Sequence, residues 1–274
     1  MSPFEAFLLG ALQGIAEFLP ISSSGHLALL QMLFGLEESE HMLLFDVFLH
    51  LGTLAAVCVV LRKDIKALLQ LVGKLFTKAG RASLGQDATL RLLVLLVLAT
   101  LPLLIIIPFK GYIEGLMASP VFIGFMLLLT GLVLQLTDLV PKGGKTEKTA
   151  RVTDVLFVGL MQGLAVVPGL SRSGMTISGG LFRGFDRRFA FRLSFLMSLP
   201  AILGATVLEV GDAIGQPFDP SLILPILIGT VTAALLGCAS LILVNRLVLS
   251  KHFSKFSWYC LLVGAITLFV GIVK

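Results

Sequence analysis

The sequence predicts an all-α polytopic membrane protein in which six spanning helices and two re-entrant helix hairpins form an inverted-topology repeat. Three features support this fold class: an apolar composition, two apolar regions broken by polar loops, and a sequence match between those regions. Of the 274 residues, 57% are hydrophobic and 14% are charged, with a mean hydropathy of +1.00. A soluble domain has roughly 45–50% apolar residues. We therefore expect a single membrane domain that covers residues 1–274.

Six apolar runs are long enough to cross a bilayer as helices, which takes about 20 residues. They are residues 42–61, 90–109, 119–140, 189–210, 222–245 and 256–273. The net charge of +5 does not indicate nucleic-acid binding, because the basic residues fall in loops between these runs. The three cysteines lie in apolar runs, and their odd number offers no disulfide framework. No basic residue precedes Arg62, so a cleavable signal peptide is not expected.

Two further apolar regions, residues 4–36 and 152–185, are each interrupted near the middle by a polar stretch. The interruptions read "LPISSSGH" and "VPGLSRSGMT", and they leave halves too short to span a bilayer. Each region therefore predicts a helix, a polar loop and a returning helix. Non-helical backbone at membrane depth is tolerated only where protein or a water-filled cavity surrounds it.

The two broken regions match each other without gaps at an offset of 149 residues. "GALQGIAEFLPISSSGH" (10–26) and "GLMQGLAVVPGLSRSGM" (159–175) share seven identities in seventeen positions. The match predicts an internal duplication with halves at about 1–140 and 150–274, joined by a polar cytoplasmic linker at 141–151.

Basic residues set the expected orientation, because cytoplasmic loops carry an excess of Lys and Arg. Of the 21 basic residues, 18 fall in the segments 62–91, 142–151, 183–192 and 246–255, which we assign to the cytoplasm. Acidic residues dominate around 37–41, 110–118 and 211–221, which belong outside. Both termini are then outside, and the two hairpins enter from opposite faces. Such inverted repeats bring broken helices together around a site near the midplane.

Arg172 lies in the second polar loop, where the repeat places it opposite Ser23. Ionisable groups at membrane depth are rare and usually functional. An arginine among hydroxyls and helix ends fits an anion, above all phosphate. The proposed phosphate-binding residues are Ser22, Ser24, Ser171, Ser173 and Thr176, with Glu17, Ser23, His26 and Arg172 as catalytic candidates.

Structural roles compete with these assignments. A serine before a helix is commonly an N-cap, and glycines 10, 14, 159 and 163 suit close helix packing. Gln13 and Glu17 lie one helical turn apart, so their hydrogen bond can be purely structural. Asp46 and His50, also four residues apart, are either a relay or a self-satisfied pair.

The residues resemble those of the bacitracin-resistance undecaprenyl-diphosphate phosphatases of bacterial membranes. The resemblance covers nearly the whole chain and is most specific in two motifs: (E/Q)xxxE, here Gln13 to Glu17 followed by "FLPISSSGH", and PGxSRSxxT, here "PGLSRSGMT" from Pro168 to Thr176. It implies an inner-membrane hydrolase that removes the terminal phosphate of undecaprenyl diphosphate. It also implies an active site open to the outer face and dependence on a divalent metal. The expected partners are a polyprenyl diphosphate lipid and membrane lipids, with no nucleic acid, and a homodimer is left open.

Diphosphate hydrolysis requires charge neutralisation, an in-line nucleophile and a proton route. Gln13 and Glu17 are expected to hold Mg²⁺ or Ca²⁺ through oxygen ligands, with the diphosphate completing the shell. Ser23 is the candidate nucleophile and His26 the general base or acid, while direct attack by water stays open. The anion, rather than a protein carboxylate, is the expected partner of Arg172, and the alternative is a structural ion pair, most plausibly with Glu17.

Two other functions share parts of this sequence pattern. A phosphatase of the membrane phosphatidic-acid type would need a histidine six residues after the arginine, where this chain has Ser178. A secondary transporter or lipid flippase is the stronger alternative, because inverted repeats with broken helices are transporter architecture.

Overall fold

The computed structural model describes residues 1–36, 40–77, 87–213, 220–250 and 252–273. Its helices are α1 (Pro3–Ala16), α2 (Ser23–Phe34), α3 (Glu40–Val60), α4 (Arg62–Leu75), α6 (Ala88–Thr100), α7 (Lys110–Gly115), α8 (Pro120–Leu136), α9 (Val152–Leu164), α10 (Arg172–Phe182), α11 (Arg187–Ala213), α12 (Ile223–Leu249) and α13 (Phe256–Val273). Short 3₁₀ turns extend several of them, including η1 (Leu101–Ile105) after α6 and η6 (Phe253–Lys255) before α13. The all-α prediction is confirmed for the described residues.

The six predicted spans are also confirmed as helices long and apolar enough to cross a membrane. They cover Met42–Val60, Ala88–Ile105, Pro120–Leu139, Arg187–Leu208, Pro220–Leu249 and Phe253–Val273. Serine or aspartate caps begin two of them, since Asp87 accepts a hydrogen bond from the Thr89 N–H and Ser119 from that of Phe122. Glu37, Glu38 and Asp219, which the charge pattern assigns outside, lie beyond the described residues.

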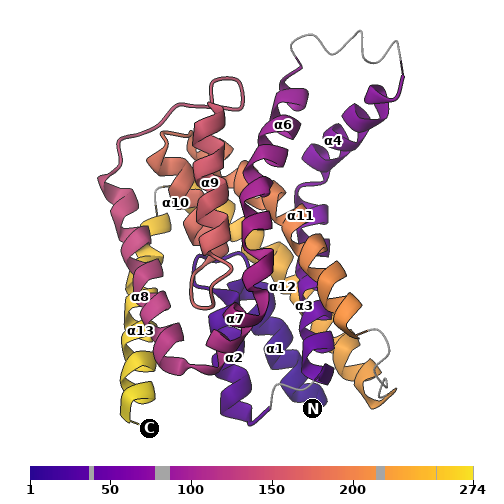
Figure 1. Ribbon diagram of the computed structural model, residues 1–274, viewed down its shortest axis with the longest axis vertical. Coiled ribbons are helices and arrows are strands. Elements are labelled where there is room, and N and C mark those ends of the chain that lie inside the picture. Colours follow the sequence, from indigo (N-terminus) through magenta and orange to yellow (C-terminus); the bar gives the residue numbers. More distant parts are fainter. Residues whose placement is uncertain (37–39, 78–86, 214–219, 251, 274) are drawn as a thin grey trace.

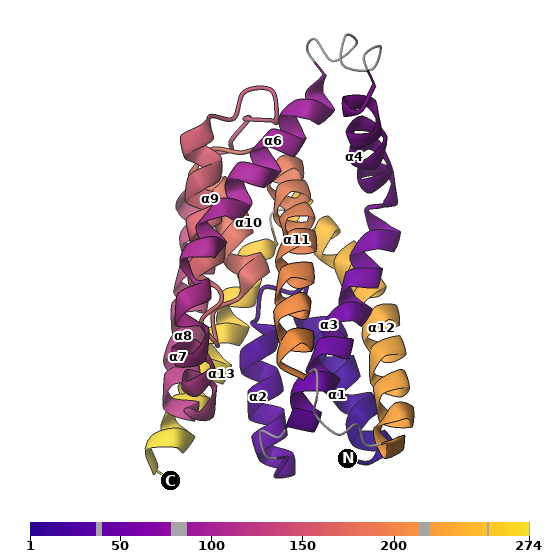
Figure 2. The same cartoon turned by 45° about the vertical axis from the view of Figure 1, so that its right-hand side comes forward.

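Two helices, α4 and α7, lie in segments that the charge pattern assigns to loops. The basic segment 62–91 was read as a loop, but its first part forms α4 (Figure 2). Leu71 is buried, and Ile65 and Leu68 pack against the main core, while the lysines of this helix are exposed. The apolar stripe at helical spacing explains why the segment is a helix rather than a loop.

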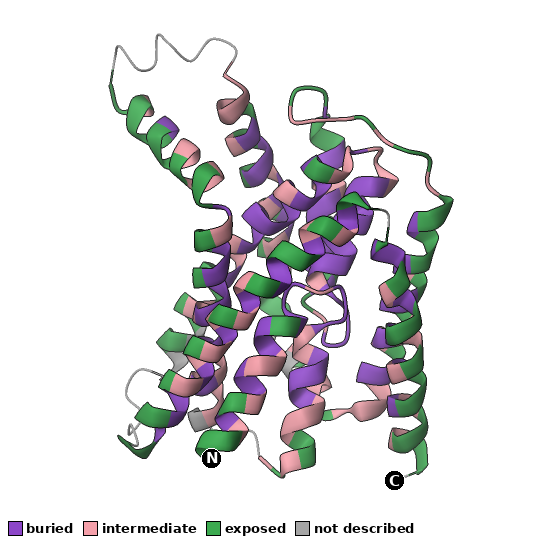
Figure 3. Ribbon diagram, turned by 180° about the vertical axis from the view of Figure 1, so that it is seen from behind, coloured by how far each residue is buried: buried purple, intermediate pink, exposed green. Residues whose placement is uncertain are grey.

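The two interrupted regions form helix pairs that lie toward opposite ends of the molecule (Figure 1). α1 and α2 are near the end where both termini lie, α9 and α10 are near the other end, and their connecting loops meet at mid-height. Both loops are mostly buried, as the purple ribbon at the centre of Figure 3 shows. The polar residues of the two motifs are thereby brought to the middle of the molecule.

The first helix of each predicted half, α1 or α9, packs against a helix from the other predicted half. A Cβ on Gly10 of α1 would overlap the backbone of Gly229 in α12, and one on Gly14 would lie 2.6 Å from the carbonyl oxygen of Ala233. A Cβ on Gly159 of α9 would likewise overlap the backbone of Ala99 in α6. The packing role is confirmed for Gly10, Gly14 and Gly159, whereas a Cβ on Gly163 would lie no closer than 3.4 Å to Ile106.

A buried carboxylate, that of Asp154, holds the linker 141–151 in place at the end of the molecule opposite the termini. Asp154, which is fully buried, accepts hydrogen bonds from Lys145 Nζ at 2.9 Å and from Arg183 Nε at 2.9 Å. It also accepts the backbone N–H of Arg151 at 3.0 Å. These contacts fix the entry of α9 and hence the position of the second polar loop.

Candidate active site

The first polar loop, residues 17–22, leads from the end of α1 into the start of α2. Ser22 is the N-cap of α2, and its side chain accepts the backbone N–H of Gly25 at 3.3 Å. Ser22 has a φ of 70°, a conformation that is costly for a residue other than glycine. Such strain persists only where the surrounding structure imposes it, and it is concentrated at functional sites.

The second polar loop, residues 165–171, is shaped by a glycine and a serine cap. Gly169 has a φ of 93°, and a Cβ there would lie 2.7 Å from the carbonyl oxygen of Ile123. Ser171 caps α10 by accepting the Gly174 N–H at 3.1 Å. The two loops touch, because Ser173 Oγ donates to the carbonyl oxygen of Leu19 at 3.2 Å.

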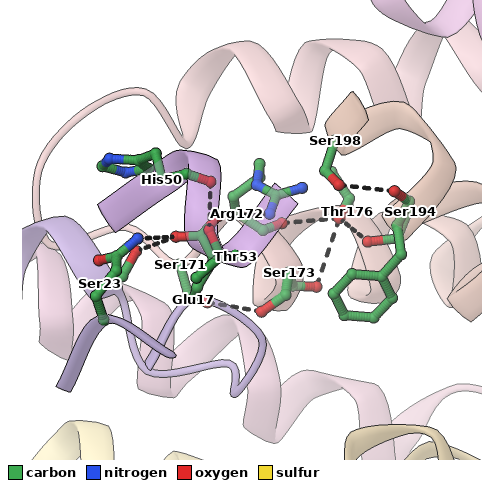
Figure 4. Close-up of polar contacts among 12 residues, drawn as sticks. Glu17, Ser23, His50, Thr53, Ser171, Arg172, Ser173, Thr176, Ser194 and Ser198 are labelled. Carbon is green, nitrogen blue, oxygen red and sulfur yellow. Dashed lines mark hydrogen bonds and ion pairs between the residues drawn. The ribbon is translucent and has the colours of Figure 1, made fainter. Parts of the chain in front are cut away.

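Glu17 is the centre at which residues of both loops converge (Figure 4). Its Oε2 accepts hydrogen bonds from Ser23 Oγ at 2.6 Å and from Gln13 Nε2 at 3.1 Å. Its Oε1 pairs with Arg172 Nη2 at 2.7 Å. The carboxylate is buried, so these three partners stabilise a charge that would otherwise be costly at this depth.

Arg172 therefore has a protein carboxylate as its partner, and the expectation that an anion alone would pair with it is wrong. The ion pair joins residues 155 positions apart, which the repeat alignment, with Ser23 opposite Arg172, did not reveal. The second terminal nitrogen, Nη1, is buried and has no hydrogen-bond partner. A buried guanidinium N–H without a partner is costly, and an anionic oxygen would satisfy it.

The ring of His26, expected to act on Ser23, is hydrogen-bonded to other residues. Its Nδ1 lies 2.8 Å from the carbonyl oxygen of Ser22, and its Nε2 lies 2.9 Å from the hydroxyl of Tyr259. Both ring nitrogens thus have partners other than Ser23. The sequence does not single out Tyr259, because it lies at the start of an apolar spanning run and outside both motifs.

The remaining hydroxyls form two small groups. Ser22 Oγ lies 3.5 Å from Ser24 Oγ, and Ser171 Oγ lies 3.2 Å from Ser173 Oγ. Thr176 faces away from this pairing: its hydroxyl donates to the carbonyl oxygen of Arg172 at 2.8 Å and lies 2.6 Å from Ser194 Oγ of α11 (Figure 4). Ser194 was also missed, although a serine in an apolar helix four residues before Ser198 is a usable signal.

Asp46 and His50, which the sequence offers as a relay or a self-satisfied pair, are linked through the backbone of Asp46. His50 Nδ1 donates to the backbone carbonyl of Asp46 at 2.8 Å, and the Asp46 carboxylate accepts from Gln31 Nε2 at 3.0 Å. His50 is close enough to Glu17 to interact with it electrostatically, and Figure 4 places its ring above Ser23. α3 thus contributes to the polar centre beside the two loops.

Gln13 is the residue that bears on a metal site. It is fully buried, and its Oε1 has no hydrogen-bond partner. Within the described residues, no three His, Cys, Asp or Glu side chains are grouped so as to hold a metal ion. The donor set consequently fits a metal only if Gln13 and Glu17 supply some of the oxygens and a bound diphosphate supplies others.

Comparison with known proteins agrees with the motifs. A family model described as bacitracin resistance protein BacA matches residues 6–266. A protein named undecaprenyl-diphosphatase from Desulforapulum autotrophicum is 40% identical over 281 residues, covering 100% of both chains. Proteins of the same name from Desulfosudis oleivorans and Carboxydothermus hydrogenoformans are 40% and 38% identical, covering 99% and 96% of this chain and 99% and 95% of their own.

Proposed function

Because the chain belongs to the bacitracin resistance protein BacA family, we propose that it is a multi-pass membrane phosphatase that hydrolyses undecaprenyl diphosphate to undecaprenyl phosphate and inorganic phosphate. Undecaprenyl phosphate is the lipid carrier for peptidoglycan synthesis, so the reaction regenerates that carrier, and it confers resistance to bacitracin. Relatives that match along their whole length are named for this reaction. They favour the phosphatase over a transporter or flippase.

A single observation carries the assignment of the site: Glu17 contacts a hydroxyl and a guanidinium at once. Ser23 Oγ lies 2.6 Å from one carboxylate oxygen, and Arg172 Nη2 lies 2.7 Å from the other. A nucleophile, a base and a phosphate-binding cation thus share one buried centre, which is the set that phosphoryl transfer requires.

The proposed reaction begins with attack of Ser23 Oγ on the terminal phosphorus of the diphosphate. Glu17 accepts the serine proton and passes it to the leaving oxygen as the anhydride P–O bond breaks, so that undecaprenyl phosphate leaves and Glu17 is again a carboxylate. Water then attacks the phosphoserine, giving its proton to Glu17, and inorganic phosphate is released as the proton returns to Ser23. This scheme gives the base role to Glu17 rather than His26, whose ring nitrogens are held by Ser22 and Tyr259.

Arg172 and the loop hydroxyls bind the phosphoryl oxygens in this scheme. Nη1 of Arg172 supplies the unpartnered donor, and Ser22, Ser24, Ser171 and Ser173 line the loops on either side of it. Thr176 acts less directly, since its hydroxyl donates to the backbone of Arg172 and thereby holds the start of α10. His26 likewise holds Ser22.

A divalent cation, Mg²⁺ or Ca²⁺, would be held by Gln13 Oε1, Glu17 and the diphosphate. When bound it would neutralise charge on the substrate. Excess EDTA should abolish turnover, and restoring either metal should recover it. Full activity in EDTA would remove the metal from the proposal.

The proposed membrane arrangement is an inverted repeat with re-entrant hairpins, both termini outside and the site open to the outer face. The opposite placement of the two helix pairs (Figure 1) and the basic residues at the end remote from the termini support it. The halves are residues 1–140 and 150–274. A homodimer, left open by the sequence, would be tested by measuring the mass of the purified protein in detergent.

The direct test of function is release of phosphate from undecaprenyl diphosphate by the purified protein. We expect catalytic release by the wild type. Transport of the lipid between leaflets without any phosphate release would contradict the proposal.

A further inference from the structure

A groove of about 570 Å³ lies between the first polar loop and the turn that joins α12 to α13. Its walls are mainly apolar and include Ile15, Leu19, Leu247 and Phe256. The volume is within the range of about 300–1,000 Å³ that is typical of ligand sites. A membrane protein is surrounded by lipid, so the acyl chains of lipids are the apolar groups available to fill this groove.

The two ends of the groove differ in chemistry. Lys255 and His252 line one end, and both are exposed. They lie in the turn between two spanning helices, which puts them at a membrane face, and the positive end of the α13 dipole is beside them. Leu19 and Ile21, of the loop that carries Glu17 and Ser22, line the other end, further along α13, where Cys260 Sγ donates to the carbonyl oxygen of Pro20 at 3.4 Å.

We propose that this groove binds an anionic phospholipid, with its phosphate at Lys255 and His252 and one acyl chain against Leu19 and Ile21. Basic pockets between spanning helices recognise anionic headgroups in this way. The prenyl chain of the substrate fits less well, because a chain that entered from the Glu17 end would run toward the charged end at the membrane face. Lys255 and His252 offer such a chain no favourable contact.

Tyr259 connects the groove to the catalytic loop. It lines the groove, and its hydroxyl lies 2.9 Å from His26 Nε2 with the rings stacked at a centroid distance of 5.6 Å. The carbonyl oxygen of Ser22 can only accept, so Nδ1 of neutral His26 carries the proton and Nε2 accepts from Tyr259. An acyl chain packed on Tyr259 therefore restrains His26 and, through it, Ser22. Tyr259 is a positioning residue in this account.

The binding test does not depend on the proposed reaction. The full chain is reconstituted in vesicles that contain equal amounts of phosphatidylglycerol and phosphatidylcholine. It is then extracted gently, and the lipid that it retains is identified by native mass spectrometry. Wild type should retain phosphatidylglycerol in preference to phosphatidylcholine. Lys255→Gln should reduce that preference about fivefold, the factor expected for one lysine near an anionic headgroup. The control is Lys148→Gln, which removes an exposed lysine of the linker away from the groove and should leave it unchanged.

The activity test rests on the proposed function. Turnover of wild type and Lys148→Gln should rise severalfold when phosphatidylglycerol is added to phosphatidylcholine vesicles, whereas Lys255→Gln should keep its basal rate and lose the rise. Tyr259→Phe should retain the lipid but also lose the rise, which a purely structural tyrosine would not do.

Three results would overturn the inference. Equal retention of both lipids by wild type, or the same lipid preference in Lys255→Gln, would remove the anion site. If instead Leu247→Trp raised KM for undecaprenyl diphosphate but not for a short soluble diphosphate, in pure phosphatidylcholine, the groove would belong to the prenyl chain of the substrate. Absence of turnover in every lipid would contradict the proposed function while leaving the binding result intact.

Discussion

Ser23 and Glu17 are the residues on which the chemistry depends most directly. Removing the hydroxyl in Ser23→Ala, or the charge in Glu17→Gln, should lower kcat by at least about 10²-fold, the usual cost of losing a transition-state group. The amount of folded protein in detergent should be similar for Ser23→Ala, because an alanine fits the same space. Near-normal kcat in Ser23→Ala would refute the nucleophile.

Two substitutions of Arg172 distinguish its catalytic role from its structural role. Arg172→Lys can keep the ion pair with Glu17 but has no second planar nitrogen to replace Nη1, so kcat should fall about 10²-fold with little change in Tm. Arg172→Met leaves Glu17 buried without its cation and should cost about 3–5 kcal/mol of stability. Both are measured by turnover and thermal unfolding in one detergent. A large loss of Tm in the lysine variant, or full kcat, would contradict this division.

At the residue scale, the motifs predicted which side chains gather but not how they pair. Spacing within the chain placed Gln13 one turn from Glu17, and the structure has that hydrogen bond. The Glu17–Arg172 and His26–Tyr259 contacts join positions far apart in sequence, so no local spacing encodes them. They depend on how α13 and the second loop dock against the first.

The close contact between α1 and α12 is the element on which the position of the first loop depends. Gly10→Ala would force its Cβ into the backbone of Gly229, which cannot move aside as a flexible side chain would. Overpacking of this kind costs typically about 1–3 kcal/mol, so Tm should fall.

Gly204→Ala is the matched control, since a Cβ on this glycine of α11 has nothing within 4 Å. Alanine there should leave Tm unchanged or raise it slightly through helix propensity. Equal melting temperatures for Gly10→Ala and Gly204→Ala would show that the α1–α12 contact is looser than the structure has it.

The hydrophobic runs predicted which segments form spanning helices. They did not predict where those helices end, or that α4 is a helix. In the apolar run at 90–109, the α-helix ends before the run does. Pro102 and Pro108 have no N–H to continue the helical hydrogen bonds, so 3₁₀ turns follow. α4 was overlooked because its charges suggested a loop, although its apolar residues recur at helical spacing.

At the scale of the whole molecule, orientation in the membrane is the property most open to test. The test uses a variant whose three native cysteines are replaced. A single cysteine placed at Glu38 of this variant should react with an impermeant maleimide added to intact cells. A single cysteine placed at Lys148 should react only after the cells are lysed. Lys148 is preferred to Lys145, which pairs with the buried Asp154. Labelling of position 148 with position 38 silent would reverse the topology.

The central claim is that Ser23, with Glu17 as its base, forms a covalent intermediate with the terminal phosphoryl group. Stereochemistry tests it without requiring the intermediate to accumulate. The terminal phosphorus of undecaprenyl diphosphate is made chiral with sulfur and two oxygen isotopes, and the substrate is hydrolysed in water enriched in a third. Two in-line displacements, first by Ser23 and then by water, predict thiophosphate with net retention of configuration at phosphorus. Net inversion would mean a single displacement by water and would contradict the account.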